Sequence, residues 1–469
     1  MKKFLSILLA VTIVLSLCAC GESGNNGESG PALQMGYARE KIMPDEPVPL
    51  GGYGNTSQRF SENFLDYLYT TCIAAKEGED LILFYTNDLL LPNNSWVSEV
   101  RDRVSIELKV PKDRILLSFT HTHSGPDIFS SEPVMKAYRA KWVEACVEVA
   151  KEAIADLTPA TLYAGKTEAT DMNAVRHYLL QDGTYGGDNF GDFNQGIVGH
   201  AEENDDEMVL LKADREGDKQ DILIINWQAH PCKTGGGTKT DISADFPGAT
   251  CEAVMAETDM LCAYFSGACG NQNTSSRVPG ESLSDDMDKE QMGQALAKIA
   301  IDALPSLQPV EGSGIQTTQV TFEYAYNHDD EDKYVEAQQA VAYWDGHTNY
   351  EASAYAKTLG FSSIYHAKAV IARMTRAQSG SMELDAVRIG NFAFITAPFE
   401  MFASHGVYIK SNSPFENTMV FECSNQYQSY IPTAAAYDYG CYESYTSIFA
   451  KGAGEAVAEK FVEMLNGLK

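Results

Sequence analysis

The chain has 469 residues and carries 65 acidic side chains against 35 basic ones, which gives a formal net charge of -30 at pH 7. A negative charge of this size argues against binding to nucleic acid and against adhesion to anionic lipid, because both depend on basic surfaces. The length is sufficient to bury a large hydrophobic core.

The first residues indicate export. A lysine pair opens the chain, and the apolar run Phe4–Leu17 that follows is too short to cross a bilayer as a helix. The run ends in LCACG, which resembles a bacterial lipoprotein signal with Cys20 as the acylated residue. We therefore expect residues 1–19 to be a signal peptide and residues 20–32 a flexible, Gly/Ser/Asn/Glu-rich tether that holds an exported protein to the membrane. An ordinary signal peptide with incidental cysteines is the alternative.

Beyond the tether, apolar runs with strand character alternate with helical stretches. We expect strands at 80–85, 115–119, 222–227, 261–265, 320–326, 384–389, 392–397 and 419–421, and helices at 97–108, 134–157, 246–258, 289–304, 333–344, 363–375 and 450–468. Asp245 is available as the N-terminal cap of the helix at 246–258. The alternation predicts an α/β fold of mixed sheets flanked by helices. Because no linker follows the tether, residues 33–469 are expected to form one domain.

A short motif places two of the nine histidines one residue apart, in LLSFTHTHSGP. The strand expected at 115–119 runs into them, and side chains at i and i+2 of a strand point to the same face. The side chains of His121 and His123 are thus expected to point in the same direction. Paired imidazoles suit a metal or an acid–base site, while two hydrogen-bonded histidines at a strand end fit the pattern equally well.

Three further apolar runs also end in polar groups. His230 follows the strand expected at 222–227, and Glu400 and Tyr430 follow the last two expected strands. In α/β proteins functional groups collect beyond the carboxyl ends of strands. Two histidines and a carboxylate are enough protein ligands for a catalytic zinc ion, which lowers the pKa of water and polarises a carbonyl. Taken singly, each residue also fits a turn, a helix start or a packed aromatic.

Several motifs together resemble a known family. They are, in order along residues 36–445, GYAREKIMPDEPVPLGGYG, SFTHTHSGPD, Asn173 to Arg176, NWQAHP, ISADFPG, FSGACGNQN, PFEMF and SNQYQSYIPT. The chain resembles the catalytic domain of the neutral/alkaline non-lysosomal ceramidases, zinc enzymes that cleave the amide bond of ceramide, a sphingolipid. The resemblance implies a ceramidase-like catalytic fold and one zinc ion per chain, with the ligands His121, His230, Glu400 and Tyr430. Tyr427 is the competing tyrosine.

The resemblance also implies roles beside the metal, and the chain departs from the family in two places. His123 and Arg176 would hold the substrate carbonyl or the transition state. Where ceramidases carry a serine once taken as a nucleophile, this chain has Asn273, an amide that cannot replace it. The chain also ends in a helix at Lys469, where ceramidases continue into a β-sandwich domain.

These features predict a zinc-dependent hydrolase that cleaves an amide, of ceramide or another N-acyl lipid, by zinc-activated water, with Asn273 near the substrate. Two alternatives stay open. One is a zinc hydrolase of a different amide or ester, and the other is a non-catalytic lipoprotein that binds a ligand. The complete set of ligands favours the hydrolases, because a binding module does not need an open metal position beside a second histidine and an arginine.

The anchor gives a first prediction. If Cys20 carries lipid, a Cys20→Ser variant should leave the membrane fraction of expressing cells, because a tether without an acyl chain has no apolar anchor. Fractionation followed by blotting measures this. A variant that stays with the membrane, or a mature N-terminus mapped to another residue, would contradict the lipoprotein interpretation.

Overall fold

The computed structural model describes residues 32–53, 59–187, 190–191, 193–236, 238–281 and 284–469. The predicted signal peptide and Cys20 lie outside the described residues. Within them, no helix combines the length and the apolar character needed to cross a membrane.

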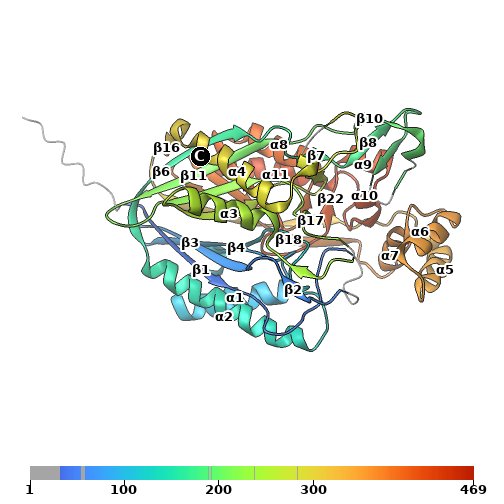
Figure 1. Ribbon diagram of the computed structural model, residues 1–469, viewed down its shortest axis with the longest axis horizontal. Helices are drawn as coiled ribbons and strands as arrows, with labels where there is room; N and C mark the ends of the chain where they lie inside the picture. The colour runs from blue at the N-terminus through green and yellow to red at the C-terminus, as the bar shows by residue number, and fades with distance from the viewer. Residues whose placement is uncertain (1–31, 54–58, 188–189, 192, 237, 282–283) are drawn as a thin grey trace, which may run out of the picture.

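Two β-sheets packed face to face form the centre of the molecule (Figure 1). The larger sheet has the order β14-β12-β11-β6-β1-β3-β4-β5, with β16 beside β6. Its strands are β1 (Gln34–Lys41), β3 (Tyr69–Glu77), β4 (Asp80–Asn87), β5 (Ile115–Phe119), β6 (Thr158–Glu168), β11 (Glu207–Arg215), β12 (Ile222–Trp227), β14 (Leu261–Ser266) and β16 (Gln308–Pro309). The smaller sheet joins β17 (Ile315–Ala325), β18 (Ser379–Ile389), β19 (Phe392–Thr396) and β21 (Asn417–Phe421) in that order.

The inner faces of both sheets form one apolar core. Aromatic side chains join the sheets there: the rings of Phe265 and Phe421 stack at 4.2 Å between centroids, and those of Phe394 and Phe421 at 4.8 Å. All three residues are almost fully buried. The core fixes how the carboxyl ends of the two sets of strands sit relative to each other.

Helices cover the outer faces. Helices α1 (Asn94–Leu108) and α2 (Val134–Ala155) pack on β1, β3, β4 and β5, whereas α3 (Asp245–Glu257) and α4 (Lys289–Ala303) pack on the other half of the large sheet. The smaller sheet is covered by α8 (Ala403–Asn412) and α11 (Ala453–Gly467). The result is a layered arrangement of helices, sheet, sheet and helices.

Between β17 and β18, which pair with each other, the chain forms a helical insert of α5 (Tyr334–Trp344), α6 (Asn349–Thr358) and α7 (Ile364–Arg373). The insert has a small core of its own and lies to one side of the sheets, at the right of Figure 1. The remaining elements are β2 (Asn63–Phe64), β7 (Ala174–Val175), β8 (His177–Leu180), β9 (Tyr185–Gly187), β10 (Ile197–His200), β13 (Asp241–Ile242), β15 (Gln272–Asn273), β20 (Glu400–Met401), β22 (Tyr430–Ile431), α9 (Ala434–Tyr439) and α10 (Tyr442–Thr446).

The predicted α/β class with mixed sheets flanked by helices is confirmed, and every strand and helix expected from the sequence is present. The strands expected at 115–119 and 222–227 have the same bounds as β5 and β12, whereas the ends of the other expected elements are shifted. Helices α6, α8, α9 and α10 were not predicted. The role expected of Asp245 was wrong, because it is the first residue of α3 and Ala244 occupies the cap position. The Asp245 carboxylate instead accepts hydrogen bonds from the backbone N–H groups of Phe246 and Thr234, each at 2.7 Å.

Three pairs of parallel strands place the functional loops. Strands β4 and β5 run parallel, as do β12 and β14 in the same sheet and β19 and β21 in the smaller one. The loop after β21 is bonded to strand β5, since the Asn425 backbone N–H donates to the Leu117 carbonyl and the Asn425 Oδ1 accepts from the Leu117 N–H at 2.8 Å. Loops from both sheets therefore meet at one edge.

Candidate metal centre

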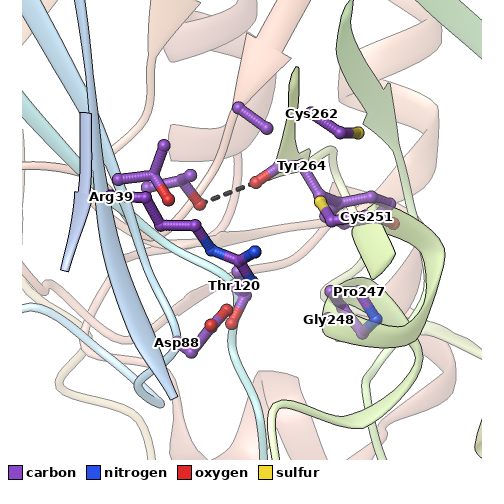
Figure 2. A pocket seen from close by; sticks show the side chains of 11 residues that line it. Arg39, Asp88, Thr120, Pro247, Gly248, Cys251, Cys262 and Tyr264 are labelled. Carbon is purple, nitrogen blue, oxygen red and sulfur yellow. Dashed lines mark hydrogen bonds between the residues drawn. The ribbon is translucent and has the colours of Figure 1, made fainter. Parts of the chain in front are cut away.

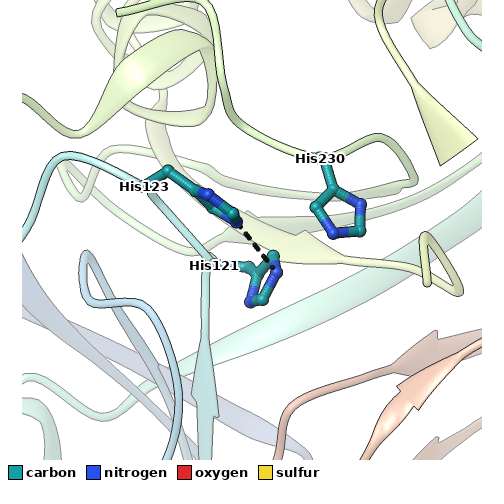
Figure 3. A group of neighbouring side chains, drawn as sticks. All are labelled: His121, His123 and His230. Atoms are coloured by element: carbon teal, nitrogen blue, oxygen red, sulfur yellow. Dashed lines mark hydrogen bonds between the residues drawn. The ribbon is translucent and has the colours of Figure 1, made fainter. Parts of the chain in front are cut away.

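Three histidines and one carboxylate meet where these loops converge. His121 Nε2 lies 3.3 Å from His123 Nε2 and 3.3 Å from Glu400 Oε2, and His230 Nε2 lies 3.4 Å from the same oxygen. Figure 3 shows the three imidazoles facing one another. His121 and His123 follow β5, His230 follows β12, and Glu400 begins β20 after β19. The four side chains are buried, His123 being the most exposed at 8%.

The two histidines of the THTH motif converge, but not through strand alternation. Strand β5 ends at Phe119, and His121 has a left-handed backbone with φ of 69°. Its N–H donates to the Leu89 carbonyl, while the N–H of His123 donates to the Pro231 carbonyl. The turn, held by the loops on each side, brings the rings together.

Backbone carbonyls fix the other nitrogen of two of these rings. His121 Nδ1 lies 2.9 Å from the Leu90 carbonyl, and His230 Nδ1 lies 2.8 Å from that of Cys269. A carbonyl only accepts, so each Nδ1 carries a proton, and each Nε2 is the ring nitrogen that remains to bind a metal. This is the arrangement in which histidines bind metals.

The residues present fit a cation. Within the described chain, the buried atoms His230 Nε2 and Glu400 Oε2 have no hydrogen-bond partner. A buried polar atom left unpaired costs about 1–3 kcal/mol, and a divalent cation between them would satisfy both. Two imidazoles and one carboxylate are a zinc ligand set that leaves a coordination position for a further ligand.

Electrostatics hold Glu400 and His230 in the ionisation states that a metal requires. Burial alone would raise the pKa of Glu400, but the adjacent His121 outweighs it and holds that pKa well below the usual range. Burial, followed by the charge of Arg176, lowers the pKa of His230 to about 4. Glu400 is therefore anionic and His230 neutral near pH 7, and a metal binds carboxylate and imidazole in these forms.

The two tyrosines of the late motif have different partners. The parallel pairing of β20 with β22 sets Glu400 opposite Tyr430. Tyr427 donates its hydroxyl to Glu400 Oε1 at 2.8 Å, which leaves Oε2 for the centre. The Tyr430 hydroxyl accepts from Arg176 Nη2 at 3.4 Å. Tyr427 thus orients the carboxylate, and Tyr430 stays the predicted fourth ligand.

Arg176 is fixed by a residue that sequence reasoning missed. Glu443, in α10, accepts from Arg176 Nε at 2.8 Å and from its Nη2 at 2.6 Å, and its other oxygen lies 2.8 Å from His177 Nε2. The side chain of Glu443 is 1% exposed. Burial would raise its pKa, but His177 and then Arg176 outweigh burial and lower the pKa strongly. No motif marks Glu443, so the sequence held no signal for it.

The turn after β14 carries the predicted Asn273. This residue pairs with Ala174 of β7, and its Oδ1 lies 3.5 Å from Arg176 Nη1. Cys269, in the same turn, lies 2.7 Å from Glu422 Oε1, and burial, then Glu422, raises the pKa of its thiol well above the ordinary value. Asn273 thus faces the arginine, whereas the Cys269 thiol donates a hydrogen bond to the buried carboxyl group of Glu422.

A cavity of about 820 Å³ opens on this centre. On the side of the sheets its lining includes His123, Arg176, Asn273, Tyr430 and Tyr442, and helix α6 contributes the opposite wall. Its volume is within the range of about 300–1,000 Å³ that small-molecule sites occupy. A substrate carbonyl therefore has space beside the histidines.

A second, much smaller cavity lies between β3, β4 and α3 (Figure 2). Its volume is about 10 Å³, and its lining includes Arg39, Asp88 and Thr86, whose Oγ1 donates to the Tyr264 carbonyl at 2.6 Å. A cavity of this size holds about one water molecule. It is part of the packing and offers no substrate site.

Comparisons with known proteins support the fold. No protein-family model and no curated protein sequence matches the chain. Among solved structures, the neutral ceramidase of Pseudomonas aeruginosa superposes with a TM-score of 0.67 at 17% identity, covering 93% of this chain and 74% of that one. A ceramidase complexed with C2 gives a TM-score of 0.69 at 16% identity, with coverages of 93% and 75%. This chain has the ceramidase fold. The fold that the sequence motifs implied is thereby confirmed.

The site predicts the metal content. Purified protein should bind about one zinc ion per chain, as a single centre of two histidines and a carboxylate implies. His121→Ala and His230→Ala should each lose that zinc, since each removes an Nε2 donor. Elemental analysis after dialysis measures the content. His347→Ala, at an exposed position of the insert, is the control and should keep full occupancy. Full zinc in His230→Ala would contradict the assignment.

The Arg176–Glu443 pair predicts a pH-dependent stability. Glu443→Gln leaves the guanidinium uncompensated and should lower the free energy of unfolding by about 3 kcal/mol at pH 7. Because the pKa of Glu443 is lowered on folding, its contribution is complete above the ordinary value of 4.5 and is lost as the pH falls below it. Urea unfolding at several pH values should show the two proteins converging in acid.

The control for this effect is Glu281→Gln, which alters a pair with His200 whose carboxylate is 38% exposed. Its effect should stay within about 1 kcal/mol. A Glu443→Gln variant as stable as the wild type at pH 7 would show that the buried pair does not support the fold.

Proposed function

We propose that this chain is a member of the neutral ceramidase family and that it hydrolyses a carboxylic amide at a single zinc ion held by His121, His230, Glu400 and Tyr430. The observation that carries the proposal is the convergence of two Nε2 atoms on the unpaired Glu400 Oε2, at 3.3 and 3.4 Å, at the end of a cavity. The shared fold supports it. Ceramide and other N-acyl lipids are the first substrates to assay.

A zinc ion bound there would lower the pKa of water and polarise the substrate carbonyl. The protein would supply the remaining contacts. His123 lines the cavity beside His121, and Arg176 lies against the Tyr430 hydroxyl, so both can donate hydrogen bonds to the oxygen that gains charge. The carbon–nitrogen bond breaks, the acyl part takes the hydroxyl of water, and the amine leaves with the proton.

The surroundings of the cavity favour direct attack by water over a covalent intermediate. Asn273 replaces the serine of the ceramidases and bonds to Arg176. The Cys269 thiol is engaged with Glu422. Cys232 is the thiol among the described lining residues, and it is therefore the first place to look for an acyl adduct.

The lipid anchor on Cys20 is part of the same proposal: an exported enzyme held to the membrane by lipid, at the bacterial cell surface or on the periplasmic side. Hydrolysis of a different amide or of an ester would use the same groups. A binding role without turnover is the remaining alternative. Arg176 and His123 argue against it, because both line the cavity beside the position that we propose for the carbonyl.

The mechanism predicts an order of effects. His123→Ala should lower kcat about a hundredfold to a thousandfold on any amide that the zinc-loaded protein hydrolyses, which is the usual loss for one oxyanion contact. Asn273→Ala should cost far less, because the amide is at most a positioning group. Single-turnover assays with mass spectrometry should find no acyl adduct. An adduct on a serine, threonine or cysteine would overturn the mechanism, and inactive wild-type protein with bound zinc would favour the binding role.

A further inference from the structure

Helix α6 of the insert forms one wall of the cavity that opens on the candidate metal centre. Its lining residues are Asn349, Tyr350, Ser353, Ala354 and Lys357. This spacing places them along one face of the helix. Ala352 and Ala356, on another face, are fully buried in the core of the insert. Packing within the insert thus fixes which face α6 turns to the cavity.

The lining of the cavity combines tyrosine rings with polar groups and has little aliphatic surface. The α6 face offers an amide, a phenol, a hydroxyl and an ammonium group, and the start of α7 adds Ser362 and Ser363. Among the described lining residues, no aliphatic side chain is larger than that of Ala354. Burial of alkyl groups stabilises a complex by about 25 cal/mol per Å² where apolar surface receives them. Here the apolar surface comes from tyrosine rings, and an alkyl chain along α6 would also cover hydroxyl and amide groups.

The charges of the lining favour an anion. The protein has a formal net charge of -30, yet the described lining contains two cations, Arg176 and Lys357, and no carboxylate. Arg176 is compensated by Glu443 at 2.6 Å. Lys357 forms no ion pair with any residue in the described part of the chain. An exposed ammonium group at the wall of a cavity without acidic groups attracts a negatively charged ligand.

We propose that the substrate is an amide that carries an anionic group, such as a carboxylate, at a distance from the scissile carbonyl, and that Lys357 is its counter-ion. This inference rests on the amide hydrolysis proposed above. The carbonyl lies at the histidines, the anionic group lies at α6, and the tyrosines that line the cavity contact the part between them. Lys357 is a specificity-determining residue, and a neutral long-chain lipid is a poor substrate.

The test compares matched substrates. A series of N-butyryl ω-amino acids of increasing chain length is assayed against the matching N-butyryl amino alcohols and against a long-chain ceramide. The zinc-loaded wild type should prefer the best acid over its alcohol by about tenfold or more in kcat/KM, the usual effect of one charged hydrogen bond. Lys357→Met should bring the ratio of the two kcat/KM values, acid over alcohol, close to one. Lys357→Glu should reverse the preference, so that the alcohol becomes the better substrate.

The control is Lys368→Met. Lys368 is an exposed lysine of the same insert whose Nζ lies 5.7 Å from the Trp344 ring and which does not line the cavity. For this variant, the ratio of kcat/KM for the acid to kcat/KM for the alcohol should equal that of the wild type. A ratio near one in the wild type, a ratio unaltered by Lys357→Met, or ceramide as the best substrate would overturn the inference while leaving amide hydrolysis in place.

Failure of the proposed function gives a different result, namely that the zinc-loaded wild type hydrolyses none of these amides. Calorimetry of the same acids and alcohols then decides the inference alone. Tighter binding of the acids that is lost in Lys357→Met supports an anion subsite at α6. Equal binding of acids and alcohols, or none of either, rejects it.

Discussion

The carboxylate of Glu400 is the constraint on which the rest of this site depends. It is buried, its pKa is held well below the usual range, and one oxygen has no hydrogen-bond partner among the described residues. An anion in such a place is stable only beside positive charge. The pairing of β20 with β22 and the Tyr427 hydroxyl fix the carboxylate so that its free oxygen faces two imidazole nitrogens. The geometry therefore suits a cation, and the α/β scaffold brings the candidate ligands together around one position.

That scaffold explains why groups from distant parts of the sequence meet. His121 and His230 leave strands of the larger sheet, whereas Glu400 follows a strand of the smaller one. The aromatic core between the sheets sets their relative position, and the bonds between Leu117 and Asn425 connect strand β5 directly to the loop after β21. A large-to-small change in this core, such as Phe421→Ala, would typically cost about 3–5 kcal/mol. The same substitution would also leave the distance between the histidines and the carboxylate less well fixed. Stability and ligand geometry therefore depend on the same contacts.

The sequence predicted the parts of the site that local patterns carry. Apolar runs ending in His121, His230 and Glu400 were visible, because strands and their polar ends leave a linear signal. Glu443 was not, because its partner Arg176 is remote in the chain and a pairing across such a distance leaves no pattern. Helix α6 was missed because its apolar face consists mainly of alanines such as Ala352 and Ala356, whose burial depends on α5 and α7. Asp245 was expected as a cap from its residue type and its place directly before the helix, but its carboxylate accepts a hydrogen bond from Thr234 instead.

The two walls of the cavity have separate structural origins, and this bears on what a likeness of fold can establish. The wall with His123 and Arg176 belongs to loops that the sheets position, so it follows the fold. The wall with Lys357 belongs to an insert between the paired strands β17 and β18, with its own small core. Changes in that insert leave the sheet pairing, and hence the metal ligands, in place. The likeness of fold therefore concerns the sheets that carry the first wall, whereas in our proposal the substrate is selected by side chains that the sheets do not constrain.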